Sequence, residues 1–474
     1  MTTIKILVKN CGAIIAKNNK KVRDKFTITS ISFVGKKKII KKMECWKFIA
    51  GRPTLINLGI NSMNPNLTYI DSTKYNELSE EQFENNITAL DYQLTIIDVL
   101  LQKLNNPINK SGVIVKLDAG KGKSFITAKI IAQLHVKTLI IVPNSGVLDN
   151  WKDKIFTKEL FPNIDLGYYY TKGKKDGDVV IMVINSALSN VFKIDGQEIS
   201  WQEYMSTFSM VIYDEVHNYV KTSKKGEIFH RTCMRYRIGL SATPQYAGDF
   251  EPALYWYVGD LIDCNQYVIN TNIVPFIGTV YKYEYYGPEE YTQIIRNEHN
   301  GFISFGKMVK QFAQDMFRHK TIIAMVKKLH SMGRNIIIFT EHIEYCRVIA
   351  QELSTEYYVN SPESNVSALL GGASEDDLKN ARSSSIIVVT FGYGKEGLSY
   401  DQLDTLVFAT PRKSGMEQIL PRIMRQGGDI NIPRIFIDVV DMCSPNFKKQ
   451  YIERKEIYNK YNFKIIKRQI KWTV

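Results

Sequence analysis

The stretch from Val113 to Ala128, VIVKLDAGKGKSFITA, constrains this 474-residue chain more than any other. It begins with three β-branched apolar residues, continues through a glycine-containing turn with Lys123 and Ser124, and ends in a helix-compatible run. A strand that leads through such a turn into a helix forms an anion site, because backbone N–H groups and the helix N-terminus favour negative charge there. Lys123 would reach the β- and γ-phosphates of a nucleotide, and the Ser124 hydroxyl would bind Mg²⁺.

The phosphate-loop pattern is incomplete, because Leu117 replaces the first glycine of G-x-x-x-x-G-K-[ST]. An ordinary glycine turn is therefore the alternative for this stretch taken alone. The residues expected to surround the phosphates are Ala119, Gly120, Lys121, Gly122, Lys123 and Ser124.

Composition favours an intracellular globular protein of two or three domains. Apolar residues make up 44% of the chain, which is enough to build full cores. The chain has no run of about 18 uncharged apolar residues, so we expect no membrane span. Its first ten residues lack the apolar core of a signal peptide. The six cysteines include no C-x-x-C pair, so we expect reduced thiols and no zinc site.

The net charge of +14 is concentrated at the two ends. Residues 1–42 carry twelve Lys or Arg against one acid, and residues 447–474 carry nine against two, which gives +11 and +7 and leaves −4 between them. Two basic ends on a near-neutral body indicate contact with a polyanion. A lysine bias from an AT-rich genome is the alternative explanation.

Hydrophobic patterns divide the chain into three parts. Residues 1–85 form a basic α+β unit, in which 26–33 alternates like a strand and the lysines and aromatics that follow suit either a nucleic-acid surface or a guarded sheet edge. From residue 86, apolar runs alternate with helical segments, which indicates parallel sheets covered on both faces. Two such series predict two similar α/β domains, 86–270 and 271–474, the second ending in a helical, basic tail. The expected strands are 113–115, 138–142, 179–184, 210–213 and 237–240, then 336–339, 386–389, 406–409 and 435–440, and the expected helices are 94–104 and 308–330.

A second chemical motif ends the apolar run 210–213. Asp214 and Glu215 follow that run directly, and His217 comes two residues later. At the carboxyl end of a buried strand, Asp214 could hold Mg²⁺ and Glu215 could deprotonate the attacking water. A lone Asp-Glu pair is often a surface accident, but this pair follows a lysine-bearing phosphate loop by some 90 residues.

A third motif, Ser241-Ala-Thr243-Pro244, follows another apolar strand and could relay the state of the γ-phosphate. Taken alone it would be only a turn at the end of a strand. The three motifs in this order resemble motifs I, II and III of superfamily 2 helicases, and the second has the form of a DExH box.

Further similarities to these helicases extend over nearly all of the chain after residue 86. Tyr92-Gln93 is similar to their adenine-contacting glutamine, and 139–151 is similar to motif Ia, which touches the nucleic-acid backbone. Motifs IV to VI are similar to 337–341, to Thr390 with 394–398, and to Gln418-x-x-Pro-Arg-x-x-Arg. The whole layout most resembles the poxvirus transcript-release DNA helicases and their iridovirus relatives, with phage DExH helicases as the nearest rival.

The resemblance implies two RecA-like domains and assigns roles to particular residues. Arg422 and Arg425, three residues apart and expected on one helix face, would contact the γ-phosphate from the second domain. Pro421 and Ser399 replace residues usual in the family, which puts a ribose contact in doubt. The catalytic set would be Lys123, Asp214, Glu215, Arg422 and Arg425. ATP binding would add Gln93, Gly397 and Gln418, the metal ligands would be Ser124 and Asp214, the coupling residues His217, Ser241 and Thr243, and the nucleic-acid contacts Pro143, Asn144 and Thr390.

The sequence thus predicts an ATP-dependent translocase that uses Mg²⁺ and acts on DNA. An RNA helicase or a restriction motor is the rival within enzymes, and a non-hydrolysing scaffold on DNA or RNA polymerase is the rival from another class. We expect contact with the transcription machinery, no membrane association and a monomer or weak oligomer. An intracellular location follows, in the host cytoplasm or the virion if the protein is viral.

Overall fold

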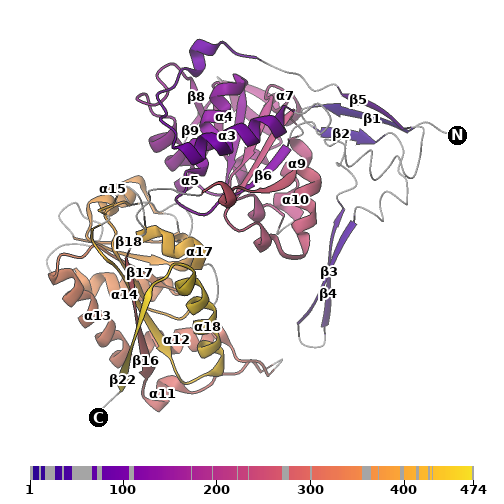
Figure 1. The fold of residues 1–474 in the computed structure, drawn as a ribbon. Helices are drawn as coiled ribbons and strands as arrows, with labels where there is room; N and C mark the ends of the chain where they lie inside the picture. The colour runs from indigo at the N-terminus through magenta and orange to yellow at the C-terminus, as the bar shows by residue number, and fades with distance from the viewer. Residues whose placement is uncertain are drawn as a thin grey trace. The chain divides into compact units, whose positions relative to one another are not determined.

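A computed structural model shows two compact units, Met1–Thr271 and Asn272–Val474, each described separately below (Figure 1). The structure describes residues 4–9, 12–15, 27–34, 37–44, 67–71, 77–105, 112–171, 173–194, 196–220, 223–232, 234–268, 277–298, 301–354, 365–371, 373–394, 400–412, 416–424, 428–429 and 431–471.

The described part of the first 76 residues consists of strands. Three of them form a small sheet in the order β2-β1-β5, and β3 and β4 form an antiparallel hairpin, which includes the strand expected at 26–33. Their bounds are β1 (Ile4–Lys9), β2 (Gly12–Ile15), β3 (Thr27–Val34), β4 (Lys37–Glu44) and β5 (Leu67–Asp71).

An eight-stranded sheet forms the centre of the first unit, in the order β15-β6-β14-β13-β7-β10-β8-β9. All neighbours are parallel except β8 and β9, as the apolar runs predict. Its strands are β6 (Gly112–Lys116), β7 (Thr138–Val142), β8 (Leu166–Tyr170), β9 (Gly173–Lys175), β10 (Val179–Val183), β13 (Met210–Tyr213), β14 (Tyr236–Ser241) and β15 (Asp260–Asp263). A separate hairpin is made by β11 (Val191–Ile194) and β12 (Gln197–Ser200).

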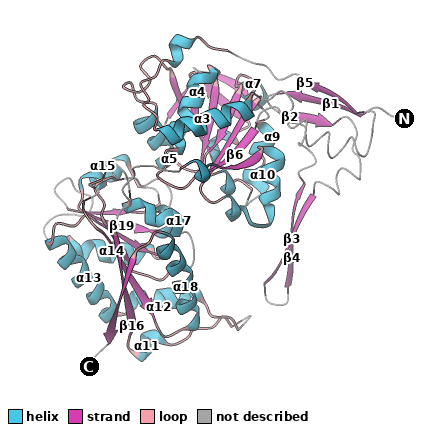
Figure 2. Ribbon diagram, viewed as in Figure 1, coloured by secondary structure: helices cyan, strands magenta, loops and turns pink. Residues whose placement is uncertain are grey.

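Helices surround this sheet (Figure 2). Leu139 and Ile141 of β7 pack in a core with the helices that follow β12 and β13, while α3 packs on α4 and β6. The helical segments are η4 (Glu80–Phe83), α3 (Asp91–Leu104), α4 (Lys123–Leu134), α5 (Ser145–Asn150), η5 (Trp151–Ile155), α6 (Ile184–Ala187), α7 (Trp201–Met205), η6 (Val216–Asn218), α8 (Ser223–Gly226), α9 (Ile228–Arg231), η7 (Pro244–Phe250), α10 (Glu251–Tyr257) and η8 (Cys264–Tyr267).

The second unit contains a seven-stranded parallel sheet in the order β18-β19-β17-β20-β21-β16-β22. Alternate residues of β17 enter different cores, with Ile337 and Phe339 in one and Ile336 and Ile338 in the other, so both faces are covered. The strands are β16 (Gly278–Tyr286), β17 (Ile336–Thr340), β18 (Val366–Leu369), β19 (Ile386–Thr390), β20 (Thr405–Phe408), β21 (Arg434–Asp441) and β22 (Lys464–Lys471).

The helices of the second unit correct two expectations. The single helix expected at 308–330 is two helices, which Asp315 separates by capping the second through the backbone N–H groups of Phe317 and Arg318. The tail is helical only to Lys460 and then forms the edge strand β22. The bounds are α11 (Glu289–Thr292), α12 (Phe305–Gln314), α13 (Met316–Ser331), α14 (Ile343–Leu353), α15 (Glu375–Ser383), α16 (Phe391–Gly394), α17 (Met416–Ile419), η9 (Leu420–Ile423) and α18 (Pro445–Lys460).

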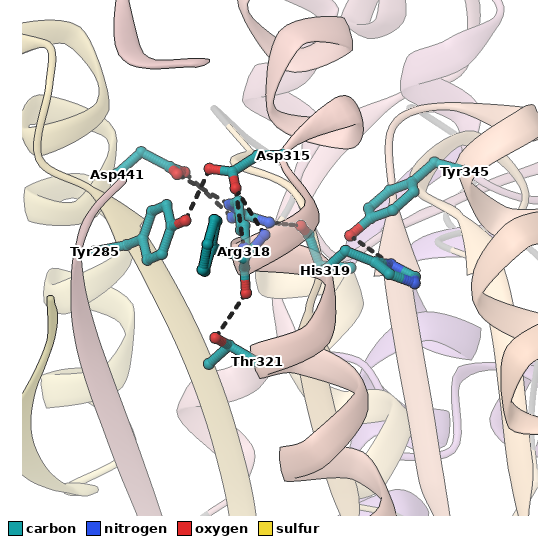
Figure 3. A network of polar contacts seen from close by, with 9 residues as sticks. Tyr285, Asp315, Arg318, His319, Thr321, Tyr345 and Asp441 are labelled. Atoms are coloured by element: carbon teal, nitrogen blue, oxygen red, sulfur yellow. Dashed lines mark hydrogen bonds and ion pairs between the residues drawn. The ribbon is translucent and has the colours of Figure 1, made fainter. Parts of the chain in front are cut away.

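A buried ion pair joins α13 to the sheet of the second unit (Figure 3). Arg318 is fully buried, and its Nε and Nη2 donate to the two oxygens of Asp441 at 2.9 and 3.2 Å. Its Nη1 donates to the carbonyl of Ala409, the residue directly after β20. Tyr285 donates its hydroxyl to Asp315 at 2.7 Å. The charges are thus paired, as buried charges must be.

Within the described residues, no helix is both long and apolar enough to cross a membrane. The described cysteines Cys264, Cys346 and Cys443 are not in disulfides.

Candidate active site

Three neighbouring strands of the first sheet end at one edge. In the observed register, Ser241 pairs with Lys116, and Tyr213 pairs with Gly239 two residues before the end of β14. Because the strands are parallel, the segments that follow them leave the sheet on the same side, where ligands bind in open α/β sheets. The register therefore brings together the phosphate loop, the Asp-Glu pair and the S-A-T-P turn.

The phosphate loop has the backbone that an anion site requires. Gly120 and Gly122 have φ values of 81° and 83°, in the left-handed region that suits glycine. Helix α4 begins at Lys123, whose Nζ donates to the carbonyls of Leu117 at 2.9 Å and Asp118 at 3.4 Å. The ammonium group and the helix N-terminus thus lie together, as phosphate binding needs.

Two groups from β15 and η8 hold the start of this loop. Asn265 Oδ1 accepts a hydrogen bond from the Asp118 N–H at 3.0 Å, and Lys116 forms an ion pair with Asp263 at 2.7 Å. These partners lie 147 residues beyond the loop in the sequence. No local pattern could have identified them, so sequence reasoning missed them.

Tyr92 and Gln93 lie against the same loop. The Tyr92 hydroxyl donates to the Lys121 carbonyl at 3.1 Å. The buried Gln93 accepts from the Leu90 N–H at 3.0 Å, and a Cβ atom at Gly122 would lie only 2.3 Å from Gln93 Nε2. The expected pair is thus next to the phosphate loop, which agrees with a role in nucleotide binding, while its adenine contact stays a prediction.

Asp214 is held from several sides at the end of β13. Its Oδ2 accepts from Trp151 Nε1 at 2.8 Å and its Oδ1 from the Glu215 N–H at 3.0 Å. The Tyr219 hydroxyl lies within hydrogen-bond distance of two carbonyls, that of Asp214 at 2.8 Å and that of Ile141 at 3.0 Å. Burial raises the pKa of Asp214, while the Trp151 hydrogen bond, the charge of Lys123 and the Glu215 N–H oppose that rise.

Glu215 occupies an unusual backbone conformation. Its φ of 50° lies in the left-handed region that residues other than glycine rarely adopt. Such backbone strain persists where the surroundings impose it and clusters at active sites. Here the hydrogen bonds of Asp214 and Tyr219 on either side fix the turn.

Ser124 and Asp214 supply ligand types that suit Mg²⁺. A hydroxyl and a carboxylate are hard oxygen ligands, and Mg²⁺ is usually bound through one or two carboxylates together with substrate phosphates and water. Over the described ranges, no group of three or more His, Cys, Asp or Glu could hold a metal by itself.

The three predicted coupling residues form a hydrogen-bonded chain. His217 Nδ1 lies 2.8 Å from Ser241 Oγ and 3.5 Å from Glu215 Oε2. Ser241 Oγ also accepts from the Thr243 N–H at 3.0 Å. The structure thus links His217 to the S-A-T-P turn by hydrogen bonds, and the Glu215 carboxylate lies near the same ring.

The predicted nucleic-acid contacts lie at strand ends in both units. Pro143 and Asn144 follow β7, and the Asn144 side chain caps α5 by accepting from the Val147 N–H at 3.1 Å. Thr390 is the last residue of β19. Asn144 thus has a structural role besides the predicted one.

The arginines of motif VI are only partly described. Arg422 lies in the short 3-10 helix η9, which ends at Ile423, and the helix face expected to carry both arginines stays a prediction. Arg434 donates from Nε to the Ile423 carbonyl at 2.5 Å and so holds the end of η9. Arg425 and Gly397 lie outside the described residues, and Gln418 belongs to α17, with its side chain undescribed.

Similarity to known proteins agrees with this site. Residues 86–246 match the family described as type III restriction enzyme, res subunit. Over 408 residues the chain is 29% identical to the African swine fever virus protein QP509L, whose name describes an ATP-dependent RNA helicase, with 81% of this chain and 75% of that protein covered. Along most of its length, the chain is thus similar to ATP-dependent helicases of large DNA viruses.

A second viral protein and a solved structure extend this similarity. The chain is 27% identical over 364 residues to protein 161L of Invertebrate iridescent virus 6, named a helicase, with 74% of this chain and 76% of that protein covered. Yeast Dbp5, solved with RNA and ADP BeF₃, shares the fold at a TM-score of 0.50 and 13% identity, covering 79% of this chain and 89% of that one. The predicted fold class, the ATP-dependent helicase class and the likeness to proteins of large DNA viruses are confirmed.

Proposed function

We propose that this helicase hydrolyses ATP at the edge formed by β6, β13 and β14, and uses the cycle to move along and unwind DNA. The observation that carries the proposal is the strand register, because the phosphate loop with Lys123, the residue Asp214 and the residue Ser241 all come at the ends of adjacent parallel strands. A phosphate loop, a carboxylate pair and a hydroxyl relay together are the parts that hydrolysis of a nucleoside triphosphate needs.

Each residue has a defined part in the proposed hydrolysis. Lys123 and the loop N–H groups bind the phosphates, and Ser124 and Asp214 would hold Mg²⁺, which neutralises developing phosphate charge when bound. Glu215 orients the attacking water and takes its proton. Arg422 and Arg425 stabilise the transition state.

The hydrogen bonds between His217, Ser241 and Thr243 could transmit the state of the nucleotide from the site to the S-A-T-P turn. When Glu215 changes its contacts with the γ-phosphate, His217 and Ser241 shift with it, and the turn that contains Thr243 responds. The nucleic acid would be gripped through its phosphates at Pro143, Asn144 and Thr390 and by the basic ends.

DNA is the substrate that we propose, and an RNA duplex is the second candidate because QP509L is named an RNA helicase. We also propose that the enzyme acts on transcription complexes inside the infected cell, as a monomer or weak oligomer. A strand-displacement assay on matched DNA and RNA duplexes, each with a 3′ or a 5′ tail, tests the proposal. ATP-dependent unwinding of a DNA substrate is the expected result, and unwinding of RNA alone would select the second candidate.

A further inference from the structure

The indole of Trp151 makes a buried contact with the proposed metal ligand. Its Nε1 donates to Asp214 Oδ2 at 2.8 Å, and the side chain of Trp151 is 1% exposed. A hydrogen bond from a neutral donor to a carboxylate is stronger than one between neutral groups. The bond therefore contributes to the position of one of the two Asp214 oxygens.

Trp151 also lies where its helix changes form. Helix α5 begins after Asn144 and ends at Asn150, and the π-helical turn η5 begins at Trp151 itself. The Phe156 N–H donates to the Trp151 carbonyl at 2.9 Å, five residues back along the chain. Single π-helical turns are rare and occur often at functional sites. The turn directs the residue that touches Asp214.

Packing alone does not account for the indole N–H. The Trp151 ring stacks on Phe156, with centroids 6.0 Å apart and planes 18° from parallel. A phenylalanine would keep this stacking and would need no hydrogen-bond acceptor. The indole adds one feature to the core, which is a donor aimed at the Asp214 carboxylate.

We infer that Trp151 is a positioning residue that links the segment from Asn144 to Ile155 to the Asp214 carboxylate. The inference rests on the proposed function, in which Pro143 and Asn144 contact nucleic acid and Asp214 holds Mg²⁺ with the nucleotide. A displacement of α5 by the nucleic acid then moves the indole, and the indole moves the carboxylate. Nucleic-acid binding would thus act directly on Mg²⁺-nucleotide binding.

The test compares Trp151→Phe with a matched control, Trp201→Phe. Trp201 begins α7 in the same unit, and its ring packs beneath the Arg231 guanidinium at 5.0 Å. The first measurement is the affinity of the full-length protein for a fluorescent ADP analogue, with Mg²⁺ and with EDTA. Loss of one hydrogen bond to a charged group predicts that Trp151→Phe reduces the Mg²⁺-dependent gain in affinity by about tenfold, with the EDTA value unchanged.

A second measurement tests the link to nucleic acid. The nucleic-acid stimulation of the ATP hydrolysis rate should fall in Trp151→Phe and remain in Trp201→Phe. In an Asp214→Asn background, Trp151→Phe should cause no further loss of Mg²⁺-dependent binding. If Trp151→Phe does not fold, Trp151→Met fills the space without a donor and permits the same comparisons.

Equal behaviour of Trp151→Phe and Trp201→Phe in both measurements would overturn the inference. A lower melting temperature with an unchanged Mg²⁺-dependent gain would also overturn it, because that result indicates a packing role only. A parent protein that nucleic acid does not stimulate would instead contradict the proposed function. The nucleotide-binding comparison would still decide whether Trp151 positions Asp214.

Discussion

Lys123 and Glu215 are the residues whose replacement separates binding from chemistry. Lys123→Ala should abolish turnover, because the phosphate charge loses its cation. Glu215→Gln should trap bound ATP while blocking cleavage, because the amide cannot take a proton. Electrostatic stabilisation and general-base catalysis each contribute roughly 10²–10⁴-fold, so phosphate release should fall by at least about a hundredfold. Near-normal turnover in Glu215→Gln would show that another group is the base.

Ser241 connects the site to the rest of the domain through His217 and the Thr243 N–H. Ser241→Ala removes both contacts without adding bulk. We expect strand displacement to fall more than ATP hydrolysis, measured on the same preparation. Ser189→Ala is a suitable control, because its hydroxyl bonds to the local Val191 carbonyl, away from this chain of contacts. Equal loss of the two activities would argue against a relay.

Arg422 and Arg425 test the contribution of the second unit. An arginine finger can contribute roughly 10³-fold or more to phosphoryl transfer. Arg425→Ala should therefore reduce hydrolysis severely while ATP affinity stays within a few fold, and Arg422→Lys should also be slow because it loses the bidentate fork. If the two arginines instead form surface ion pairs, each pair contributes less than about 1 kcal/mol and hydrolysis stays nearly normal. Parental rates in both variants would therefore show that the arginines do not stabilise the transition state.

At the residue scale, local sequence patterns were enough to predict the positions of functional side chains that follow a strand closely. Lys123, Asp214 and Ser241 each follow an apolar run, so their common edge was predictable. Asn265 was not, because it reaches the phosphate loop from a distant segment. Trp151 was part of a predicted motif, but only the fold shows that its N–H meets Asp214.

At the element scale, α18 and β22 change how the basic tail should be tested. Phe447, Tyr451 and Tyr458 of α18 are buried, Arg454 pairs with Asp438, and β22 pairs with β16. Deleting residues 447–474 would therefore remove core and unfold the second unit. The sequence could not show this, because lysines spaced among apolar residues suit an edge strand as well as a free tail.

Substitution of exposed lysines on α18 is the sharper experiment. The triple change Lys448→Gln, Lys449→Gln and Lys455→Gln should weaken nucleic-acid binding. Removal of one lysine–phosphate interaction lowers the slope of log K on log salt by about 0.9 for duplex DNA. The matched control changes Lys320, Lys327 and Lys328 of α13, which are also exposed. The same slope in both triple variants would show that the tail lysines reflect the genome's composition and do not bind nucleic acid.

The Arg318–Asp441 pair should control the stability of the second unit. Arg318→Ala leaves Asp441 buried without its partner, which typically costs about 3–5 kcal/mol. Arg347→Ala, which removes the exposed pair with Glu344, should cost less than about 1 kcal/mol. Chemical denaturation of both variants measures the difference. Similar unfolding free energies would mean that the buried pair contributes little.

At the scale of the whole molecule, two series of apolar runs were enough to predict two parallel sheets. Three strands of the second sheet were missed: β16, β18 and β22. β16 contains most of the tyrosine-rich stretch 281–287, whose tyrosines and charged residues alternate and so concealed a strand that pairs on both sides. β22 was concealed in the same way by its lysines. The domain boundaries at 85 and 270 remain predictions.

The central claim is that this chain is a motor in which nucleic acid drives ATP hydrolysis at the Lys123–Asp214–Glu215 site. The most direct test is the steady-state rate of phosphate release from ATP, measured with and without nucleic acid, for the parent and for Glu215→Gln. We predict a parental rate that rises when nucleic acid is added, and a Glu215→Gln rate that stays near zero although ATP is bound. A parent that binds ATP and nucleic acid but releases no phosphate under either condition would contradict the claim and indicate a non-hydrolysing scaffold.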